Sequence, residues 1–573
     1  MIHTIELKMI KKLLAVGVCT TSLLLATAAY AQQPPSSAEP DVIIRETGRE
    51  RIQPPSPADV ISLPEIKAGA SGAATQKIFT LKRIILEGGT IYSQKEINAI
   101  AGSTLGEMAS FSDLNEIARR LTLKYREDGY MFSRVVLTPQ TVEDGTVHFK
   151  AIEGRITEVT VTGDYDDHFD LIERIANKIK SEGPGNTEEL ERYLLLIDDL
   201  PGITARSLLR PSKTQGGGEL VITIEQDDVE GSLGIDNRGS RFLGQHRGTA
   251  VAAFNSLFNM HDRTTLRWIN SLYMNQNEEL HFLDATHEQQ LGSNGLRLTG
   301  RGAVTSTHPG AFLKDQNIDG ASQLLELGLM YPLIRSRDFN INLLGGLHSL
   351  NSQSEVADIS VSKDSVRSIT AGARIDFFDS LGGINQFDFE IAKGLSILNA
   401  TSDGAGRSRT NGKHTFLRTN LTATRIQDLG WDNWSAYGSI SGQLSRDALL
   451  ASEEFSVGGP IYGRAYDSGE IAGDHGLAGV IELRYGEAVT NYDWLRSYQF
   501  FGFYDIGAVW NKGNVVAEQR RESLASAGAG VRFNLIHDMS GSVELSKPLT
   551  RDVNAEGTNG DHMRLFFSLL KRF

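Results

Sequence analysis

The chain has 573 residues, with 57 Lys plus Arg against 71 Asp plus Glu and a formal net charge of −14. This length suggests about three or four domains, and the acidic excess argues against a nucleic-acid-binding surface, because phosphate contacts require cations. With 58 Gly, 15 Pro and 40% hydrophobic residues, the composition excludes collagen, a coiled coil and wholesale disorder. A Gly-rich β protein of several domains remains.

The N-terminus has the pattern of a secretory signal. Three lysines precede the apolar run 13–25, and a small-x-small cleavage site ends at Ala31, which predicts a signal peptide over residues 1–31. Lipid attachment at Cys19 is the alternative, but the bulky Val18 before it disfavours that processing. Cleavage after Ala31 would leave a chain without cysteine, and therefore without disulfides or thiolate metal ligands.

Residues 32–77 are rich in Pro, Ser, Ala and Gln, with a charged patch at 44–52 between the prolines. This composition predicts a linker that contains one short helix, a candidate plug helix.

Two tandem units of the order β-α-α-β-β follow, over residues 78–154 and 155–228. In the first unit, Ser93 with Glu96 three residues on predicts the start of a helix. The expected elements of the first unit are 78–86, 93–101, 112–128, 133–138 and 146–153, and those of the second are 156–162, 171–180, 187–200, 205–210 and 219–225.

From residue 229 to 573 helical periodicity gives way to period-two segments separated by Gly, Asn, Asp and Ser clusters. Their connections alternate between short and long, the longest being 446–475, and an even strand number with this asymmetry is typical of a membrane barrel. We therefore expect an all-β transmembrane barrel of 16 antiparallel strands. The segments are 231–237, 247–255, 263–272, 278–286, 294–304, 323–331, 339–350, 365–376, 384–396, 413–426, 434–445, 476–487, 496–510, 523–535, 540–549 and 562–573.

Side-chain alternation in the last strands separates two faces. Asp505 shares one face with Gly507, whereas Tyr504 and Ile506 share the other; in an earlier strand Glu482 lies opposite Ile481. A charge on the lipid face costs about 2–4 kcal/mol at mid-depth, so we expect apolar residues to meet outer-membrane lipid and charges to line the lumen. The last strand ends at Phe573, which resembles the signal read by the barrel-assembly machinery.

Signal, linker, two β-α-α-β-β units and barrel together resemble the TpsB-type transporters of two-partner secretion, the haemolysin secretion or activation proteins, whose soluble units are POTRA domains. Two motifs carry the resemblance. The first lies in the long loop, similar to F-S-x-G-G followed by V-R-G-[FY], and it includes Gly458, Gly459, Gly463, Arg464 and Tyr466. The chain departs from it with Gly463 for Val and with Ala465 for Gly.

The second motif is F-x-D-x-G, at Phe503, Asp505 and Gly507. In the family the loop arginine folds into the lumen and pairs with the aspartate of this strand, so the resemblance implies a lock between Arg464 and Asp505. Alternation independently places Asp505 on the lumen face, where an arginine is stabilised by bidentate contact with a carboxylate. The alternative is an Arg464 that is a solvated loop charge.

The resemblance implies a transporter in the outer membrane of a Gram-negative bacterium. Its POTRA domains would stand in the periplasm and recognise a cognate large TpsA-type exoprotein, for example by strand addition at their sheet edges; the alternative is that they are spacers. The rival function is a barrel-assembly insertase of the same superfamily, whose relatives generally carry three or more soluble units. A passive porin and a barrel-anchored enzyme are further alternatives.

No nucleotide, metalloprotease or hydrolase motif is present, so we expect no enzyme activity, no cofactor and no metal. Residues 315–326 match the calcium-loop pattern, but the flanking helices that an EF-hand needs are not expected there. The sequence leaves open a calcium ion in this loop, the identity of the exoprotein, its activation, the role of the linker helix as a plug, and the oligomeric state.

Overall fold

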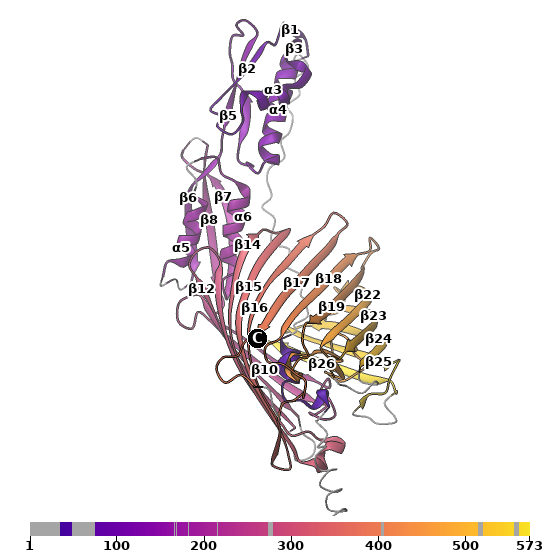
Figure 1. Cartoon of the computed structure of the whole chain (residues 1–573). Coiled ribbons are helices and arrows are strands. Elements are labelled where there is room, and N and C mark those ends of the chain that lie inside the picture. Colours follow the sequence, from indigo (N-terminus) through magenta and orange to yellow (C-terminus); the bar gives the residue numbers. More distant parts are fainter. Residues whose placement is uncertain are drawn as a thin grey trace, which may run out of the picture.

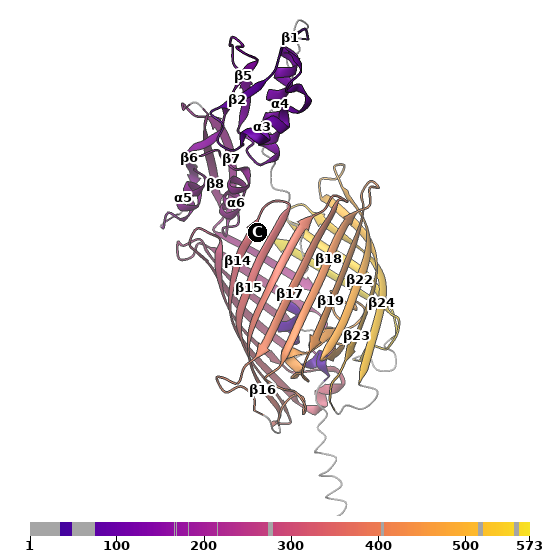
Figure 2. The ribbon, with the colours of Figure 1, turned by 45° about the horizontal axis from the view of Figure 1, so that its top comes forward.

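The computed structural model describes residues 35–48, 75–165, 167, 169–180, 183–214, 216–272, 279–402, 406–513, 520–554 and 561–573 (Figure 1). The predicted signal peptide and most of the predicted linker lie outside these residues. Two small α+β units follow each other at one end of a large β-barrel (Figures 1 and 2).

The first unit packs two helices against a three-stranded sheet of order β2-β5-β4. The backbone N–H of Ser93 donates to Glu96 Oε2 at 2.8 Å, and Ser93 Oγ accepts from Glu96 N–H, so the predicted helix start is confirmed. The residues that α4 buries are Leu114, Ile117, Ala118, Leu121, Thr122 and Tyr125. The elements are β2 (Arg83–Glu87), α3 (Gln94–Ala101), α4 (Phe111–Glu127), β4 (Arg134–Leu137) and β5 (Thr146–Ile152).

The single strand predicted over 78–86 was wrong. The chain forms β1 (Lys77–Thr80), breaks at Leu81, and continues as β2 in a different sheet, while β1 pairs with β3 (Met108–Ser110). Leu81 is completely buried, and its N–H donates to the carbonyl oxygen of Glu107. A run of β-forming residues does not reveal such a break, because the burial of one leucine at the corner decides it.

The second unit repeats this arrangement. Its sheet has the order β6-β8-β7, and its first and last strands pair in parallel, as β2 and β5 do in the first unit. The predicted repeat is thus present in the pairing as well as in the element order. The elements are β6 (Arg155–Asp164), α5 (Leu171–Ala176), α6 (Thr187–Asp198), β7 (Ile203–Pro211) and β8 (Gly217–Gln226).

Sixteen antiparallel strands close the barrel in chain order, and β26 pairs with β9 to complete it, which confirms the predicted strand number. Their bounds are β9 (Val229–Asp236), β10 (Arg247–Asn255), β11 (Asp262–Ser271), β12 (Leu280–Leu291), β13 (Leu296–Thr307), β14 (Ile318–Arg335), β15 (Phe339–Val356), β16 (Ile359–Phe378), β17 (Gly383–Gly394), β18 (Leu417–Asp428), β19 (Trp434–Ser445), β22 (His475–Ala488), β23 (Leu495–Trp510), β24 (Arg521–Leu535), β25 (Met539–Pro548) and β26 (Arg564–Arg572).

The barrel has an apolar outside and a charged inside. On β22, Ile481 is 63% exposed whereas Glu482 is 0% exposed, and on β23, Ile506 is 52% exposed whereas Asp505 is 0% exposed. This is the alternation expected of strands that face lipid on one side and a lumen on the other. Among the described helices, none has both the length and the apolar character that a membrane crossing requires.

The second unit rests on the short turns of the barrel. Arg335 makes two 2.8 Å contacts with the carboxylate of Asp199, and His261 Nε2 lies 3.1 Å from Asp167 Oδ1. Burial alone would raise the pKa of Asp167, but the hydrogen bond from His261 and the N–H groups at the start of α5 hold it below its ordinary value of 3.8. The connections at the far end of the barrel include 446–474, so the long loops lie opposite the soluble units.

A short helix, α2 (Val42–Thr47), lies inside the barrel (Figures 1 and 2). Its residues Val42, Ile43 and Ile44 are buried in one hydrophobic cluster with lumen side chains such as Phe282 and Leu324. The helix that composition predicted in the linker is therefore present, and its apolar side packs against the inner wall.

Candidate functional site

The long connection 446–474, called the lumen loop below, folds back into the barrel. It carries β20 (Phe455–Val457) and β21 (Ile471–Gly473), which pair with each other and not with the wall. Phe455 lies on Gly476 of β22, where a Cβ would come within 1.9 Å of its ring, and Val457 lies on Gly507 of β23. The two wall glycines therefore leave the space in which the loop lies.

The glycines of the loop motif take backbone conformations that other residues avoid. Gly458, Gly459 and Gly463 have φ of 117°, 97° and 80°, and a Cβ at Gly458 would lie 2.1 Å from the carbonyl oxygen of Asp467. The turn is closed by a bond from Gly458 N–H to the carbonyl oxygen of Tyr462 at 3.0 Å. Gly463, which departs from the family motif, thus suits this tight turn.

Arg464 is buried at the tip of the loop, with 1% of its surface exposed. Its guanidinium makes its short contact with Glu482, where Nη1 lies 2.6 Å from Oε2. Asp505 lies farther from the guanidinium, 3.7 Å from Nε, and instead accepts the backbone N–H of Arg464 at 2.9 Å. The structure thus brings the predicted pair together but does not show the bidentate contact that the sequence suggested.

The ring of Phe503 packs against the guanidinium of Arg464. The guanidinium carbon of Arg464 lies 4.1 Å from the centre of the Phe503 ring, within the range of a cation–π interaction. The ring in turn covers Gly528 of β24, where a Cβ would come within 2.7 Å of it. The strand motif therefore supplies an aromatic platform as well as a carboxylate.

Glu482 was placed on the lumen face by alternation but was not linked to Arg464 from the sequence. It pairs in register with Phe503, so the alignment of β22 with β23 brings its carboxylate next to the motif. It also contacts Arg484, at 2.6 Å, and Arg532, at 2.7 Å and 3.0 Å. The register is a property of the folded sheet, and the sequence motifs carry no signal for it.

Two further contacts hold the far side of the loop tip. The Tyr466 hydroxyl is buried within hydrogen-bond distance of the carbonyl oxygens of Ala525 and Arg551, at 3.2 Å and 3.1 Å. Arg564 of β26 reaches Asp467 Oδ1 at 2.7 Å and donates to the carbonyl oxygen of Ala465 at 2.8 Å. These contacts bind the loop tip to β22, β23, β24 and β26, and Arg464 Nη1 also lies 3.9 Å from Glu544 Oε2 of β25.

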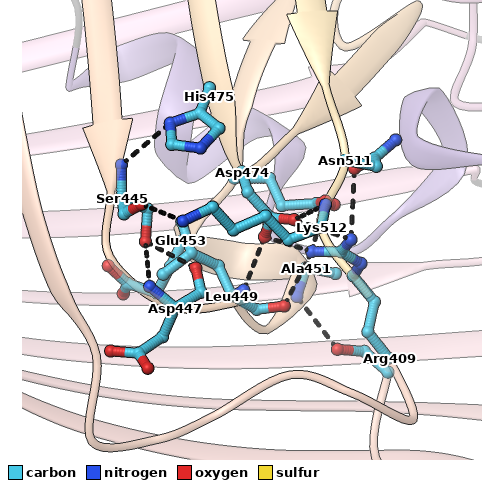
Figure 3. Close-up of polar contacts among 12 residues, drawn as sticks. Arg409, Ser445, Asp447, Leu449, Ala451, Glu453, Asp474, His475, Asn511 and Lys512 are labelled. Atoms are coloured by element: carbon cyan, nitrogen blue, oxygen red, sulfur yellow. Dashed lines mark hydrogen bonds and ion pairs between the residues drawn. The ribbon is translucent and has the colours of Figure 1, made fainter. Parts of the chain in front are cut away.

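The root of the loop is held by Asp474, which Figure 3 shows among its donors. Its carboxylate accepts from both terminal nitrogens of Arg409, at 2.6 Å and 3.2 Å, and from the backbone N–H groups of Leu449 and Lys512, each at 2.6 Å. Lys512 Nζ donates at 2.8 Å to the carbonyl oxygen of Ser445, at the end of β19. One carboxylate therefore ties both ends of the loop to neighbouring connections.

The helix α2 lies between the loop and the opposite wall. Ser468 Oγ donates to Glu46 at 3.0 Å, and Arg45 donates to the carbonyl oxygen of Ala451 at 2.7 Å. Towards the wall, Arg247 contacts Glu46 at 3.0 Å and Arg301 contacts Thr47 at 3.2 Å. Loop and helix thus occupy the lumen together.

The C-terminal Phe573 and the calcium-like segment 315–326 are the remaining candidates from the sequence. The backbone of Phe573 exchanges hydrogen bonds with Gly231 at 2.7 Å and 3.0 Å, beside the β26–β9 seam. Within the calcium-like segment, Asp319 pairs with His308 at 2.9 Å. Among the described residues there is no cluster of three or more His, Cys, Asp or Glu that could hold a metal ion.

Comparisons with known families and proteins agree with this architecture. The model of the haemolysin secretion/activation protein family ShlB/FhaC/HecB matches residues 216–533, and that of the ShlB-type POTRA domain matches residues 79–154. The heme/hemopexin transporter protein HuxB of Haemophilus influenzae (strain 86-028NP) is 23% identical over 489 residues, which is 83% of this chain and 84% of that protein. The outer membrane transporter CdiB of Escherichia coli is 23% identical over 449 residues, 75% of this chain and 72% of that protein.

Solved structures share the fold. CdiB from Escherichia coli superposes with a TM-score of 0.73 at 20% identity, covering 90% of this chain and 94% of that one. CdiB from Acinetobacter baumannii gives a TM-score of 0.63 at 17% identity, covering 93% and 97%. The chain therefore belongs to the haemolysin secretion/activation protein family, the outer-membrane transporters that secrete partner exoproteins in two-partner secretion.

Proposed function

We propose that the transporter is held closed by the lumen loop and by α2, and that both withdraw when the unfolded exoprotein passes. The observation that carries the proposal is the burial of Arg464, which lies among Glu482, Asp505 and Phe503 on the inner wall. A long charged side chain is seldom buried without a fixed partner, and an arginine so held pins the loop across the lumen.

The soluble units would receive the exoprotein in the periplasm. In the first sheet the edge strands are β2 and β4, and in the second they are β6 and β7. An edge strand offers backbone donors and acceptors to an extended chain irrespective of its sequence, which suits a partner that arrives unfolded. The firm contact of the second unit with the barrel turns would bring that chain to the entrance of the lumen.

We further propose that the chain has no enzymatic step of its own and binds no cofactor. Folding of the exoprotein outside the cell would then supply the direction of transport. During biogenesis, the terminal strand that ends at Phe573 would be recognised by the barrel-assembly machinery, and the outward apolar residues would contact lipid.

Replacement of Arg464 by Ala tests the lock. Without a contact to a charged group, worth about 1.5–3 kcal/mol, the loop would not return to the docked position from which each round of transport starts. We therefore expect secretion of the partner exoprotein to fall by about tenfold or more, while the barrel still inserts and migrates as a heat-modifiable band. Unchanged secretion by R464A would contradict the lock. Asp388→Asn, which alters a lumen carboxylate paired with Arg374 at 2.6 Å away from the loop, is the matched control and should secrete normally.

A further inference from the structure

The two carboxylates beside Arg464 do different work. Asp505 accepts the backbone N–H of Arg464 at 2.9 Å and lies 3.3 Å from Ser526 Oγ. Its other oxygen, Oδ1, has no hydrogen-bond partner among the described residues, and neither has Nε of Arg464. The short contact of the guanidinium is instead with Glu482, where Nη1 lies 2.6 Å from Oε2. A backbone N–H needs only an acceptor, whereas a guanidinium gains most from a full negative charge.

Glu482 is itself held in place by wall residues. Arg532 contacts both carboxylate oxygens, at 2.7 Å and 3.0 Å, and Arg484 contacts Oε1 at 2.6 Å. Each of these arginines is stacked on an aromatic ring, Arg532 at 3.8 Å from the centre of Phe501 and Arg484 at 4.4 Å from that of Tyr437. The carboxylate therefore points to the lumen loop from a rigid frame that the loop does not supply.

We propose that Glu482 is the positioning residue that receives the guanidinium of Arg464, and that Asp505, which lies 3.7 Å from Nε, acts mainly by holding the loop backbone. This inference rests on the proposed lock and deepens it. It assigns the charge-dependent half of the lock to a residue of β22 that lies outside both sequence motifs.

The two wall arginines that hold Glu482 also account for reversible docking of the lumen loop. Without the loop, Glu482 still contacts Arg484 and Arg532, and Glu544 still contacts Arg238. When the loop withdraws, Glu482 keeps two arginine partners, so the departure of Arg464 leaves no unpaired charge at this carboxylate. Breaking a buried ion pair is costly mainly when one partner is left uncompensated. A shared carboxylate lowers that cost and lets the loop leave and return.

The test measures how often the loop undocks. Ser456 of β20 is buried at 6% exposure, and Ser456→Cys is nearly isosteric. The only other cysteine is Cys19, within the predicted signal peptide. In the full-length chain with Cys19→Ser, reconstituted in liposomes, the rate at which a membrane-impermeant maleimide labels S456C reports the population of the undocked loop.

We expect E482Q to speed labelling about tenfold, as R464A does, which corresponds to about 1.4 kcal/mol. The double variant R464A/E482Q should label no faster than either single variant, since both remove the same contact. D505N should stay within about threefold of the parent, because Asn Oδ1 still accepts the backbone N–H. D505A should speed labelling, and should do so equally in the R464A background.

The opposite pattern would overturn the assignment: D505N as fast as R464A, with E482Q at the parent rate. If E482Q does not insert, E482D keeps the charge but retracts the carboxylate, and slow labelling of E482D would equally overturn it. Secretion separates the two proposals. Fast labelling of R464A with normal secretion would contradict the lock, while the labelling pattern would still decide which carboxylate holds Arg464. D388N, which should label at the parent rate, is the matched control.

Discussion

Val457 of the lumen loop packs directly on the bare backbone of Gly507 in β23, so closely that a Cβ at 507 would lie 2.6 Å from Val457 Cγ1. The nearest wall side-chain atom, Ala478 Cβ, is 3.3 Å from the same point. The motif glycine is thus needed for the approach of the loop and not for a special backbone conformation. This contact can be altered from either side.

Gly507→Ala should undock the loop without preventing barrel assembly. Overpacking of this kind costs about 1–3 kcal/mol, and the loop is the part that can move away. We expect G507A to raise the ion conductance of single channels in planar bilayers. Val457→Ala in the same chain removes the clashing methyl groups and should restore the parent conductance.

Gly502→Ala is the matched control for that series. It lies on the same strand, and the closest atom to its Cβ would be the carbonyl oxygen of Gly528 at 3.9 Å, an ordinary contact. Parent-like conductance is expected for G502A. If G507A had the same conductance as the parent, as is expected for G502A, the loop would not be held by this packing.

Asp474→Ala should destabilise the root of the loop. The substitution leaves two backbone N–H groups without their acceptor, at about 1–3 kcal/mol each, and removes one of the two carboxylates that Arg409 contacts, the other being Glu454 at 2.7 Å. We expect a lower midpoint of heat modification on gels. Asp447→Ala removes only the contact with the half-exposed Lys413, worth less than about 1 kcal/mol, and should leave the midpoint unchanged. Equal midpoints for both variants would contradict the anchor role.

Glu46→Ala should loosen α2 in the lumen. The change removes the contacts of the helix with Arg247 on the wall and with Ser468 on the loop. A helix that blocks the lumen should then leave more often, so longer open events are expected in single-channel recordings. Deletion of residues 35–48 should give the largest open fraction, and an unchanged open fraction after that deletion would show that α2 does not block ions.

Asp167→Ala should release the second unit from the barrel turns. It removes the contact with His261 and the acceptor for two N–H groups of α5, and we expect faster hydrogen exchange at residues 256–261. The exposed Asp164→Ala is the control. Because the pKa of Asp167 is lowered in the docked state, docking is fully supported above pH 3.8 and weakens as the pH falls through the lowered value. Equal exchange rates at residues 256–261 in D167A and D164A would contradict this assignment.

The rival function has a direct test in cells. Removal of this transporter should leave one large exoprotein stranded or degraded in the periplasm, with other outer-membrane barrels at normal levels. A general loss of outer-membrane barrels would instead favour the insertase.

The sequence by itself determined the strands and their faces. Alternation places Glu482 and Asp505 inside and Ile481 and Ile506 outside, because a strand has a period of two and a charge that faces lipid is costly. The capping residues Ser93 and Glu96 likewise determined where α3 begins, since the interaction is local.

Only the tertiary structure decided which carboxylate meets Arg464. The loop motif and the two wall strands are separated along the chain. Their contact depends on the strand register, on the wall glycines Gly476 and Gly507 that β20 covers, and on the depth to which the loop folds inward. The same holds for the break at Leu81 and for α2 within the lumen. Local patterns describe one element at a time, whereas burial of a leucine, or of a guanidinium between two strands, is a property of all the elements that surround it.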